Sequence, residues 1–135
     1  MIKVNIQRKL TDFQLDINFH HEKGIAILFG KSGAGKTMTL NCISGFEKPD
    51  HGEIYVNGNL LFSSEKKINI DPAKRKIGYI LQAPYLFPHL SVKKNLLFGM
   101  KDFDGELYEK VISILDVKDL INRSIKKLSG GEKQR

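Results

Sequence analysis

A glycine-rich run of eight residues carries the clearest chemistry in this chain, because its residue types suit phosphate binding. The run consists of Gly30, Lys31, Ser32, Gly33, Ala34, Gly35, Lys36 and Thr37. It fits the pattern Gly-x-x-x-x-Gly-Lys-Ser/Thr at every fixed position. Glycine lets the backbone curl so that several N–H groups point inward at a phosphate chain. We expect Lys36 to reach the β- and γ-phosphates of a nucleotide, and the Thr37 hydroxyl to be a ligand of Mg²⁺.

A loop of this kind needs a strand before it and a helix after it. Residues 25–29 are a short apolar run, which predicts a strand buried on both faces. Met38–Ser44 has a helical composition, and the N-terminal end of that helix would favour an anion. Gly45 can cap the helix. The alternative is a glycine-rich turn that binds nothing, and this context disfavours it.

The N-terminal part of the chain shows the alternation of half-buried strands. Residues 2–8 and 13–19 alternate apolar and polar side chains, and Thr11-Asp12 between them predicts an antiparallel hairpin. Residues 52–56 predict a further strand, and Asn57-Gly58 predicts a tight turn into residues 60–62.

The middle of the chain combines a polar stretch with a second apolar run. Residues 63–76 predict a surface loop, and residues 77–81 predict another buried strand. Gln82 follows that run. Ligands of open α/β sheets collect at the carboxyl ends of the strands, so Gln82 could face the nucleotide.

Two prolines, Pro84 and Pro88, disfavour a regular helix across the aromatic stretch that follows. Its aromatic side chains could pack within their own loop or form a docking surface for a partner, and local chemistry favours neither. Ser91 predicts the start of a helix over 92–100, and a longer helix follows Asp104. The apolar stripe expected to face the core in that longer helix is Leu107, Val111, Ile114 and Leu115.

The last eight residues, 128–135, contain a second glycine turn. Ser129 can cap a short helix there, and Gly130 and Gly131 allow close approach of an anion. Ser-Gly-Gly is also a common loop sequence, so the turn alone indicates little.

Composition limits the remaining functions. The chain has 135 residues, 41% hydrophobic and 27% charged, which are the values of one globular domain. Its net charge of +7 is dispersed, which favours a solvated surface, or one near anionic headgroups, over nucleic-acid binding. No apolar block of a signal peptide begins the chain, so a cytosolic protein is expected. The single Cys42 predicts a core residue, and the four His lack the spacing of a zinc site.

The order of three motifs resembles the ATP-binding subunit of an ABC transporter: the phosphate loop, Gln82 and residues 128–135. This resemblance implies an α/β fold with a P-loop ATPase core, an N-terminal antiparallel β-subdomain and a helical subdomain. Residues 1–82 would hold the β-subdomain and the phosphate-loop part of the core. Residues 83–135 would form the helical subdomain, which ends in the signature motif.

The resemblance also implies cofactors and partners. ATP and Mg²⁺ would be bound, with Lys36 and Gln82 acting in catalysis and Thr37 and Gln82 near the metal. Ser129, Gly130 and Gly131 would contact the γ-phosphate held by a second ATPase subunit in a homodimer or an equivalent pair. Integral membrane permease subunits would dock near residues 85–92 on the cytoplasmic face of the membrane, with an extracytoplasmic solute-binding protein as an indirect partner.

Finer detail is similar to importers. Residues 75–82 and 86–92 resemble bacterial anion, metal and sugar importers, and residues 29–33, the hairpin and residues 95–100 most resemble molybdate importers. We therefore expect a subunit that powers import of molybdate or a related anion. The alternatives are an ABC ATPase acting on nucleic acid and a non-catalytic nucleotide-binding fragment.

Two departures from the family pattern affect these expectations. The family stacks adenine on an aromatic side chain of the N-terminal sheet, and the short hairpin offers Phe13 for that role. The family also requires an apolar strand ending in Asp-Glu and then a switch His, which this sequence does not contain. We expect the chain to be the N-terminal part of a longer ATPase, incomplete at its C-terminus, with negligible turnover alone.

Overall fold

The alternating residues near the N-terminus form the hairpin that the sequence predicts. The computed structural model describes residues 1–11, 13–83 and 85–135, and in it β1 (Ile2–Lys9) pairs antiparallel with β2 (Gln14–His21). Val4 lies opposite Phe19 in this pair. The expected turn includes Asp12, which lies outside the described residues.

The rest of the sheet follows by antiparallel pairing. β3 (His51–Val56) pairs with β1, β4 (Asn59–Ser63) pairs with β3, and β5 (Ile68–Asn69) pairs with β4, giving the order β2-β1-β3-β4-β5. Asn57 and Gly58, with φ of 50° and 80°, make the turn between β3 and β4. The predictions of a strand near 52–56 and of a tight turn after it are confirmed.

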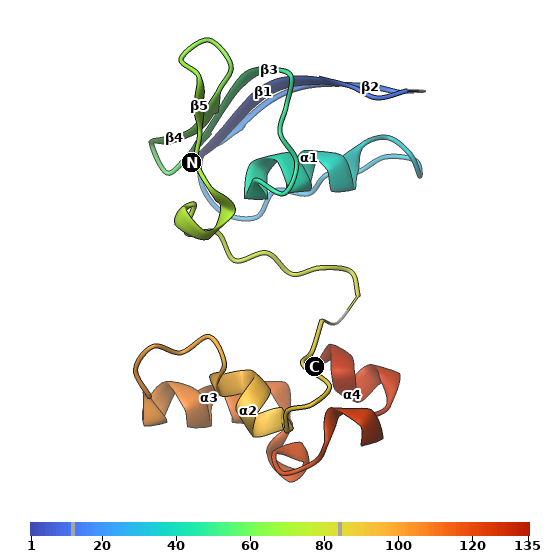
Figure 1. Cartoon of the computed structure of the whole chain (residues 1–135), viewed down its shortest axis with the longest axis vertical. Helices are drawn as coiled ribbons and strands as arrows, with labels where there is room; N and C mark the ends of the chain where they lie inside the picture. Colours follow the sequence, from blue (N-terminus) through green and yellow to red (C-terminus); the bar gives the residue numbers. More distant parts are fainter. Residues whose placement is uncertain (12, 84) are drawn as a thin grey trace. The chain divides into compact units, whose positions relative to one another are not determined.

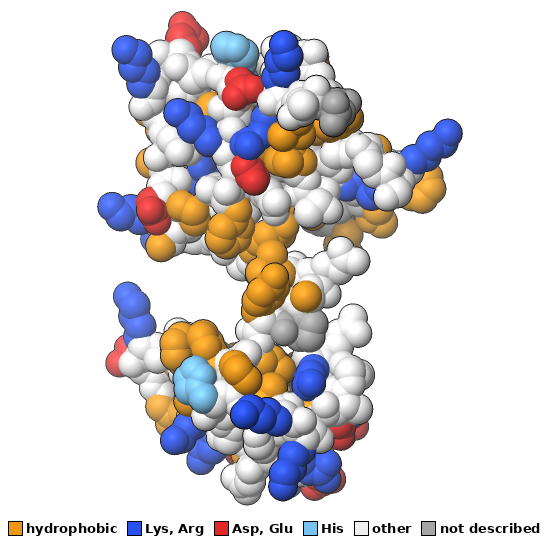
Figure 2. Space-filling view, turned by 45° about the vertical axis from the view of Figure 1, so that its right-hand side comes forward, with side chains coloured by type: hydrophobic (Ala, Val, Ile, Leu, Met, Phe, Trp, Pro, Cys, Tyr) orange, Lys and Arg blue, Asp and Glu red, His pale blue; other side chains and the backbone are white. Residues whose placement is uncertain are grey.

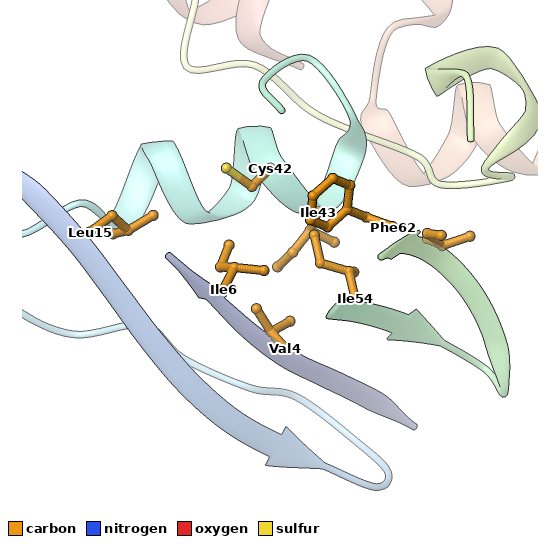
Figure 3. Close-up of a cluster of buried hydrophobic side chains, with 8 residues drawn as sticks. Val4, Ile6, Leu15, Cys42, Ile43, Ile54 and Phe62 are labelled. Carbon is orange, nitrogen blue, oxygen red and sulfur yellow. The ribbon is translucent and has the colours of Figure 1, made fainter. Parts of the chain in front are cut away.

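Helix α1 (Lys36–Ser44) packs on one face of this sheet (Figure 1). Its buried side chains and those of the sheet form one core (Figure 3), consisting of Val4, Ile6, Leu15, Cys42, Ile43, Ile54, Leu61 and Phe62. Cys42 is fully buried there, as expected. Gly45 ends the helix in the left-handed conformation, φ 90°, and its N–H donates to the Asn41 carbonyl at 2.9 Å.

The two predicted buried strands are wrong. Residues 25–29 and 77–81 have no strand hydrogen bonds, and Ile27, Phe29 and Ile80 are 82%, 99% and 96% exposed. An apolar run becomes a strand only when a neighbouring strand satisfies its N–H and C=O groups. No segment within 1–11, 13–83 or 85–135 pairs with either run. Gln82 accordingly lies in an exposed bend rather than at the end of a strand.

The predicted surface loop over 63–76 is only partly correct. It contains β5 and a 3₁₀ turn at Pro72–Lys74, which Asp71 caps through a hydrogen bond from the Ala73 N–H at 2.9 Å. Arg75 is 4% exposed, although its long charged side chain would ordinarily favour solvent. Residues 1–79 form one of two compact units.

The second unit, Ile80–Arg135, is helical. Its helices are α2 (Val92–Leu97), α3 (Gly105–Leu115) and α4 (Gly130–Gln134), with 3₁₀ turns at Lys118–Leu120 and Ile125–Lys127. Ser91 and Asp104 cap α2 and α3 through hydrogen bonds from the N–H groups of Lys94 and Leu107. α2 is shorter than the predicted 92–100, because the chain turns at Phe98 ahead of Gly99.

The buried face of α3 differs from the expected stripe. Tyr108 and Ile112 are buried, whereas Leu107 and Ile114 are 47% and 71% exposed. The core of this unit consists of Val92, Tyr108, Ile112, Val117, Leu120, Ile125 and Leu128. The correct face is rotated by one residue, because the aromatic Tyr108 takes the inward position that the sequence reading gave to Leu107.

Charged side chains are spread over the surface. Lys and Arg are interspersed with Asp and Glu on the faces visible in Figure 2. No helix in the described part of the chain has the length and apolarity needed to span a bilayer.

Candidate nucleotide-phosphate site

The glycine-rich loop has the backbone conformation that its glycines permit. Gly33 and Gly35 adopt positive φ, at 81° and 85°. Gly35 is also closely packed: a Cβ added there would lie 2.5 Å from Leu15 Cδ1 and 3.1 Å from Phe13 Cζ. Side chains of the hairpin therefore pack against the loop at Gly35, and only glycine fits at this point of contact.

The loop leads directly into the N-terminus of α1. The cap residue is Gly35, which has no side chain to accept hydrogen bonds from the first turn. The N–H groups of the first helical turn have no intrahelical acceptor, so this positive end of the helix dipole is open to an anion. Thr39 N–H and Oγ1 both donate to the Gly35 carbonyl, at 2.8 and 2.9 Å, which fixes the junction.

Lys36 is folded back onto the loop. Its ammonium group donates to the carbonyl oxygens of Gly30 at 2.8 Å and Lys31 at 2.7 Å. The charge therefore sits within the curve of the loop, where an incoming phosphate oxygen could replace a carbonyl as its acceptor.

A cavity of about 350 Å³ borders the loop. It is lined by Leu10, Phe13, Ser32, Gly33, Gly35, Lys36, Thr37 and Met38. The volume lies at the lower end of the range of small-molecule sites. Its wall is apolar on the side of Leu10 and Phe13 and polar along the loop, which suits a ligand with a flat apolar part joined to phosphates.

The second glycine turn, in the helical unit, is organised differently. The Ser129 Oγ accepts from the Glu132 N–H at 3.2 Å, and the Ser129 N–H donates to the Glu132 carboxylate at 2.7 Å. This is a capping box at the start of α4, so the predicted capping role of Ser129 is confirmed. The hydrogen bond from the Ser129 backbone, aided by its side chain, holds the pKa of Glu132 below its ordinary value.

Sequence reasoning missed Glu132, although Ser-x-x-Glu before a helix was a readable signal. It also missed Arg75, for which the sequence holds no comparable signal.

The side chain of Asn95 in α2 binds the aromatic stretch that precedes this helix. Asn95 accepts from the Phe87 N–H at 2.8 Å and donates to the Phe87 carbonyl at 3.2 Å. The rings of Phe87 and Phe98 lie 4.1 Å apart, and Tyr85 is 77% exposed. The loop thus packs one of its own aromatic side chains and exposes another.

The predicted site residues fall in two units. The phosphate loop, residues 30–37, comes together with Phe13 in the first unit. Gln82 and residues 129–131 belong to the second unit, and they are described only as parts of that unit.

The sequence profile of the family described as ABC transporter matches residues 13–135, which is most of the chain. The chain belongs to the ABC transporter family. The resemblance drawn from the phosphate loop, Gln82 and residues 128–135 is thereby confirmed.

Curated members of the ABC transporter family align with the whole chain. It is 45% identical over 136 residues to a protein of Shewanella sp. strain MR-4 named molybdenum import ATP-binding protein ModC. It is 40% identical over 139 residues to a protein of the same name from Paramagnetospirillum magneticum. The chain spans 37% and 38% of the length of these two relatives.

Solved structures of ABC proteins share the fold. The ATP-binding cassette MJ0796, described as a dimer in a post-hydrolysis state bound to ADP and Pi, matches 99% of this chain at 25% identity and a TM-score of 0.68. The chain covers 66% of that structure. The cbiO1 protein from Clostridium perfringens, described as part of the ABC transporter complex cbiONQ, matches with a TM-score of 0.69 over 98% of this chain and 57% of its own. The expected α/β ATPase fold with an antiparallel sheet is thereby confirmed.

Proposed function

We propose that this chain is part of the ATP-binding subunit of an importer that moves molybdate or a related small anion across the cell membrane. The observation that carries the proposal is the alignment of the whole chain, at 45% identity, with a molybdenum import ATP-binding protein. The open phosphate loop beside its cavity supports nucleotide binding by the same residues.

ATP and Mg²⁺ fit the residues at this loop. The positive φ of Gly33 and Gly35 and the uncapped start of α1 provide N–H groups for phosphate oxygens. Lys36 would hold the terminal phosphates, and the Thr37 hydroxyl would be a ligand of Mg²⁺. Phe13, in the apolar wall of the cavity, would contact the base. ATP supplies the free energy of transport when it is bound and cleaved.

The remaining roles extend the proposal to the whole protein. Gln82 would act on Mg²⁺ or the attacking water, and Ser129, Gly130 and Gly131 would contact ATP held by a second ATPase subunit. Residues 1–82 would form the β-subdomain with the phosphate-loop part of the ATPase core, and residues 83–135 the helical subdomain.

The partners proposed for the whole protein follow from the same proposed importer function. Two ATPase subunits would close on ATP at the cytoplasmic face of the membrane and would drive integral permease subunits. A solute-binding protein on the far side would deliver the anion. The exposed aromatic side chain of Tyr85 and the neighbouring loop held by Asn95 would face the permease.

Substitution of the loop lysine tests this proposal. In the protein as the cell produces it, Lys36→Ala should weaken Mg-ATP binding by about 100-fold, because about 2.7 kcal/mol of charge-assisted hydrogen bonding is lost. Cellular uptake of labelled molybdate should fall with it. The matched control is Lys23→Ala, which removes the same charge from an exposed turn outside the loop.

Two results would contradict the proposal at different points. Equal ATP affinity in Lys36→Ala and wild type would refute the nucleotide site. ATP affinity that falls in Lys36→Ala, together with unchanged molybdate uptake and lost uptake of another anion, would refute the substrate and keep the importer.

A further inference from the structure

Arg75 is a buried cation whose hydrogen-bond acceptors are all neutral. Its guanidinium donates to the carbonyl oxygens of Cys42 at 2.9 Å, Ile43 at 2.8 Å and Ile70 at 2.8 Å. A fourth hydrogen bond reaches the Asn69 side-chain oxygen at 2.9 Å. With only 4% of its surface exposed, Arg75 is held by the protein rather than by water.

Two of these acceptors belong to the last turn of α1, the helix that begins at the phosphate loop. The last carbonyls of a helix lack intrahelical donors and carry its negative dipole, so a cation is favourable there. Gly45 leaves room for this contact: a Cβ at that position would lie 2.6 Å from the Arg75 Nε. Arg75 therefore binds the C-terminal end of α1, the helix that begins at the phosphate loop.

The segment that follows Arg75 is attached to the same end of α1. Ile77 packs against the core of the first unit. The Tyr79 hydroxyl donates to the Asn41 side-chain oxygen at 2.7 Å, and its ring lies 5.6 Å from the ring of Phe46. Because residues 76–79 have no strand partner, side-chain contacts fix this segment in place of a backbone ladder.

We propose that Arg75 is a positioning residue that fixes residues 76–79 against the C-terminal end of the phosphate-loop helix. Arginine suits the task because its planar group has five donors in a fixed fork, whereas lysine offers a single point charge.

Backbone order parameters from ¹⁵N relaxation test the positioning directly. In Arg75→Gln, those of residues 76–79 should fall from about 0.85 to below about 0.6, while those of β1 and β2 stay unchanged. Arg75→Lys keeps the charge at the helix end and should give a smaller fall in the same residues. The matched control is Lys74→Gln, which removes one charge from an exposed neighbour and should change nothing.

Two results would overturn the proposal. Order parameters of 76–79 that stay at the wild-type value in both Arg75 variants would show that Arg75 does not fix the segment. A uniform fall across β1, β2 and α1 would show a general role in folding instead. If Arg75→Gln does not fold, the comparison of Arg75→Lys with wild type decides.

Kinetics of the protein as the cell produces it give a second, independent measurement. Arg75→Lys should leave KM for ATP within about 2-fold of the wild-type value, because the phosphate loop itself is intact.

A KM for ATP raised more than about 10-fold in Arg75→Lys would overturn the assignment of Arg75 to residues 76–79, because the phosphate loop itself would then depend on it. Absence of ATP turnover in the wild-type protein would instead contradict the proposed function, and the order parameters would then decide the role of Arg75 alone.

Discussion

The two glycine turns of this chain start helices in opposite ways. At the phosphate loop, Gly35 caps α1 with no side chain, and the first-turn N–H groups are left open. At the second turn, Ser129 and Glu132 cap α4 reciprocally, and the Glu132 carboxylate accepts a hydrogen bond from the Ser129 N–H.

The difference shows how stability is distributed between the ends of a helix. Glycine in place of a Ser or Asp cap costs α1 about a few tenths of a kcal/mol. The opposite end compensates, since Gly45 and Arg75 satisfy the carbonyls of its last turn. At α4 the N-terminal cap satisfies two backbone donors instead, the N–H groups of Ser129 and Glu132. The first-turn donors of α1 are available for a ligand, whereas these two donors of α4 are already engaged.

The largest effect is expected at Gly35, where the open turn is built on close packing. Gly35→Ala places a Cβ 2.5 Å from Leu15 Cδ1 at a φ of 85°, so both the backbone and the hairpin contact must shift. We expect Mg-ATP affinity to fall by about 100-fold, measured by equilibrium binding.

The contrast is Gly131→Ala in the capped turn, where no atom lies within 4 Å of the added Cβ. Thermal unfolding should show stability that is unchanged or higher by up to about 1 kcal/mol, because alanine favours helix over glycine. A clear loss of stability in Gly131→Ala would remove the distinction between the turns.

The second-largest effect is a loss of stability at alkaline pH, caused by Cys42 in the last turn of α1. Burial is the main reason that the pKa of the Cys42 thiol is raised from 9.0 to about 11. Above pH 9 the unfolded chain loses this proton first, so the free energy of unfolding should fall by about 1.4 kcal/mol per pH unit up to about pH 11.

The measurement is chemical denaturation of wild type and Cys42→Ala between pH 8 and 11. Cys42→Ala is expected to be less stable at pH 8, because a core side chain is shortened, but to lack this part of the slope. Parallel pH profiles for the two proteins would show that the thiol does not contribute.

The sequence allowed prediction of what is local. Strand alternation in β1, the Asn57-Gly58 turn and the Gly45 cap all depend on neighbouring residues, and the structure confirms each of them. Residues 25–29 were misread, because an apolar run defines a strand only when another segment pairs with it. Pairing is a tertiary property that no local pattern contains.

The residues of the candidate site show the same difference between local and tertiary features. The phosphate loop was predictable because its conformation follows from its own glycines. Arg75 was not, because its burial depends on carbonyl groups more than 30 positions earlier in the chain. Glu132 was predictable in principle from the spacing Ser-x-x-Glu.

The third effect is smaller and concerns the capped turn. Ser129→Ala removes the hydroxyl that accepts from the Glu132 N–H, and should lower the stability of the helical unit by about 1 kcal/mol. Ser129→Asp, which retains an acceptor at the cap, should recover most of it. Urea unfolding followed by circular dichroism measures both. Equal loss in the two variants would mean that the hydroxyl caps nothing.

The smallest effect should appear at acid pH, opposite to that of Cys42. Since the folded state lowers the pKa of Glu132 below 4.5, its contribution to stability is complete above the unfolded value and is lost as pH falls through the folded value. Glu132→Gln keeps a side-chain acceptor for the Ser129 N–H but does not titrate. Unfolding between pH 3 and 6 should therefore be less pH-dependent in this variant than in wild type. An unchanged acid slope would mean that the carboxylate is not held by the capping box, so the difference between the two glycine turns would rest on the Ser129 hydroxyl alone.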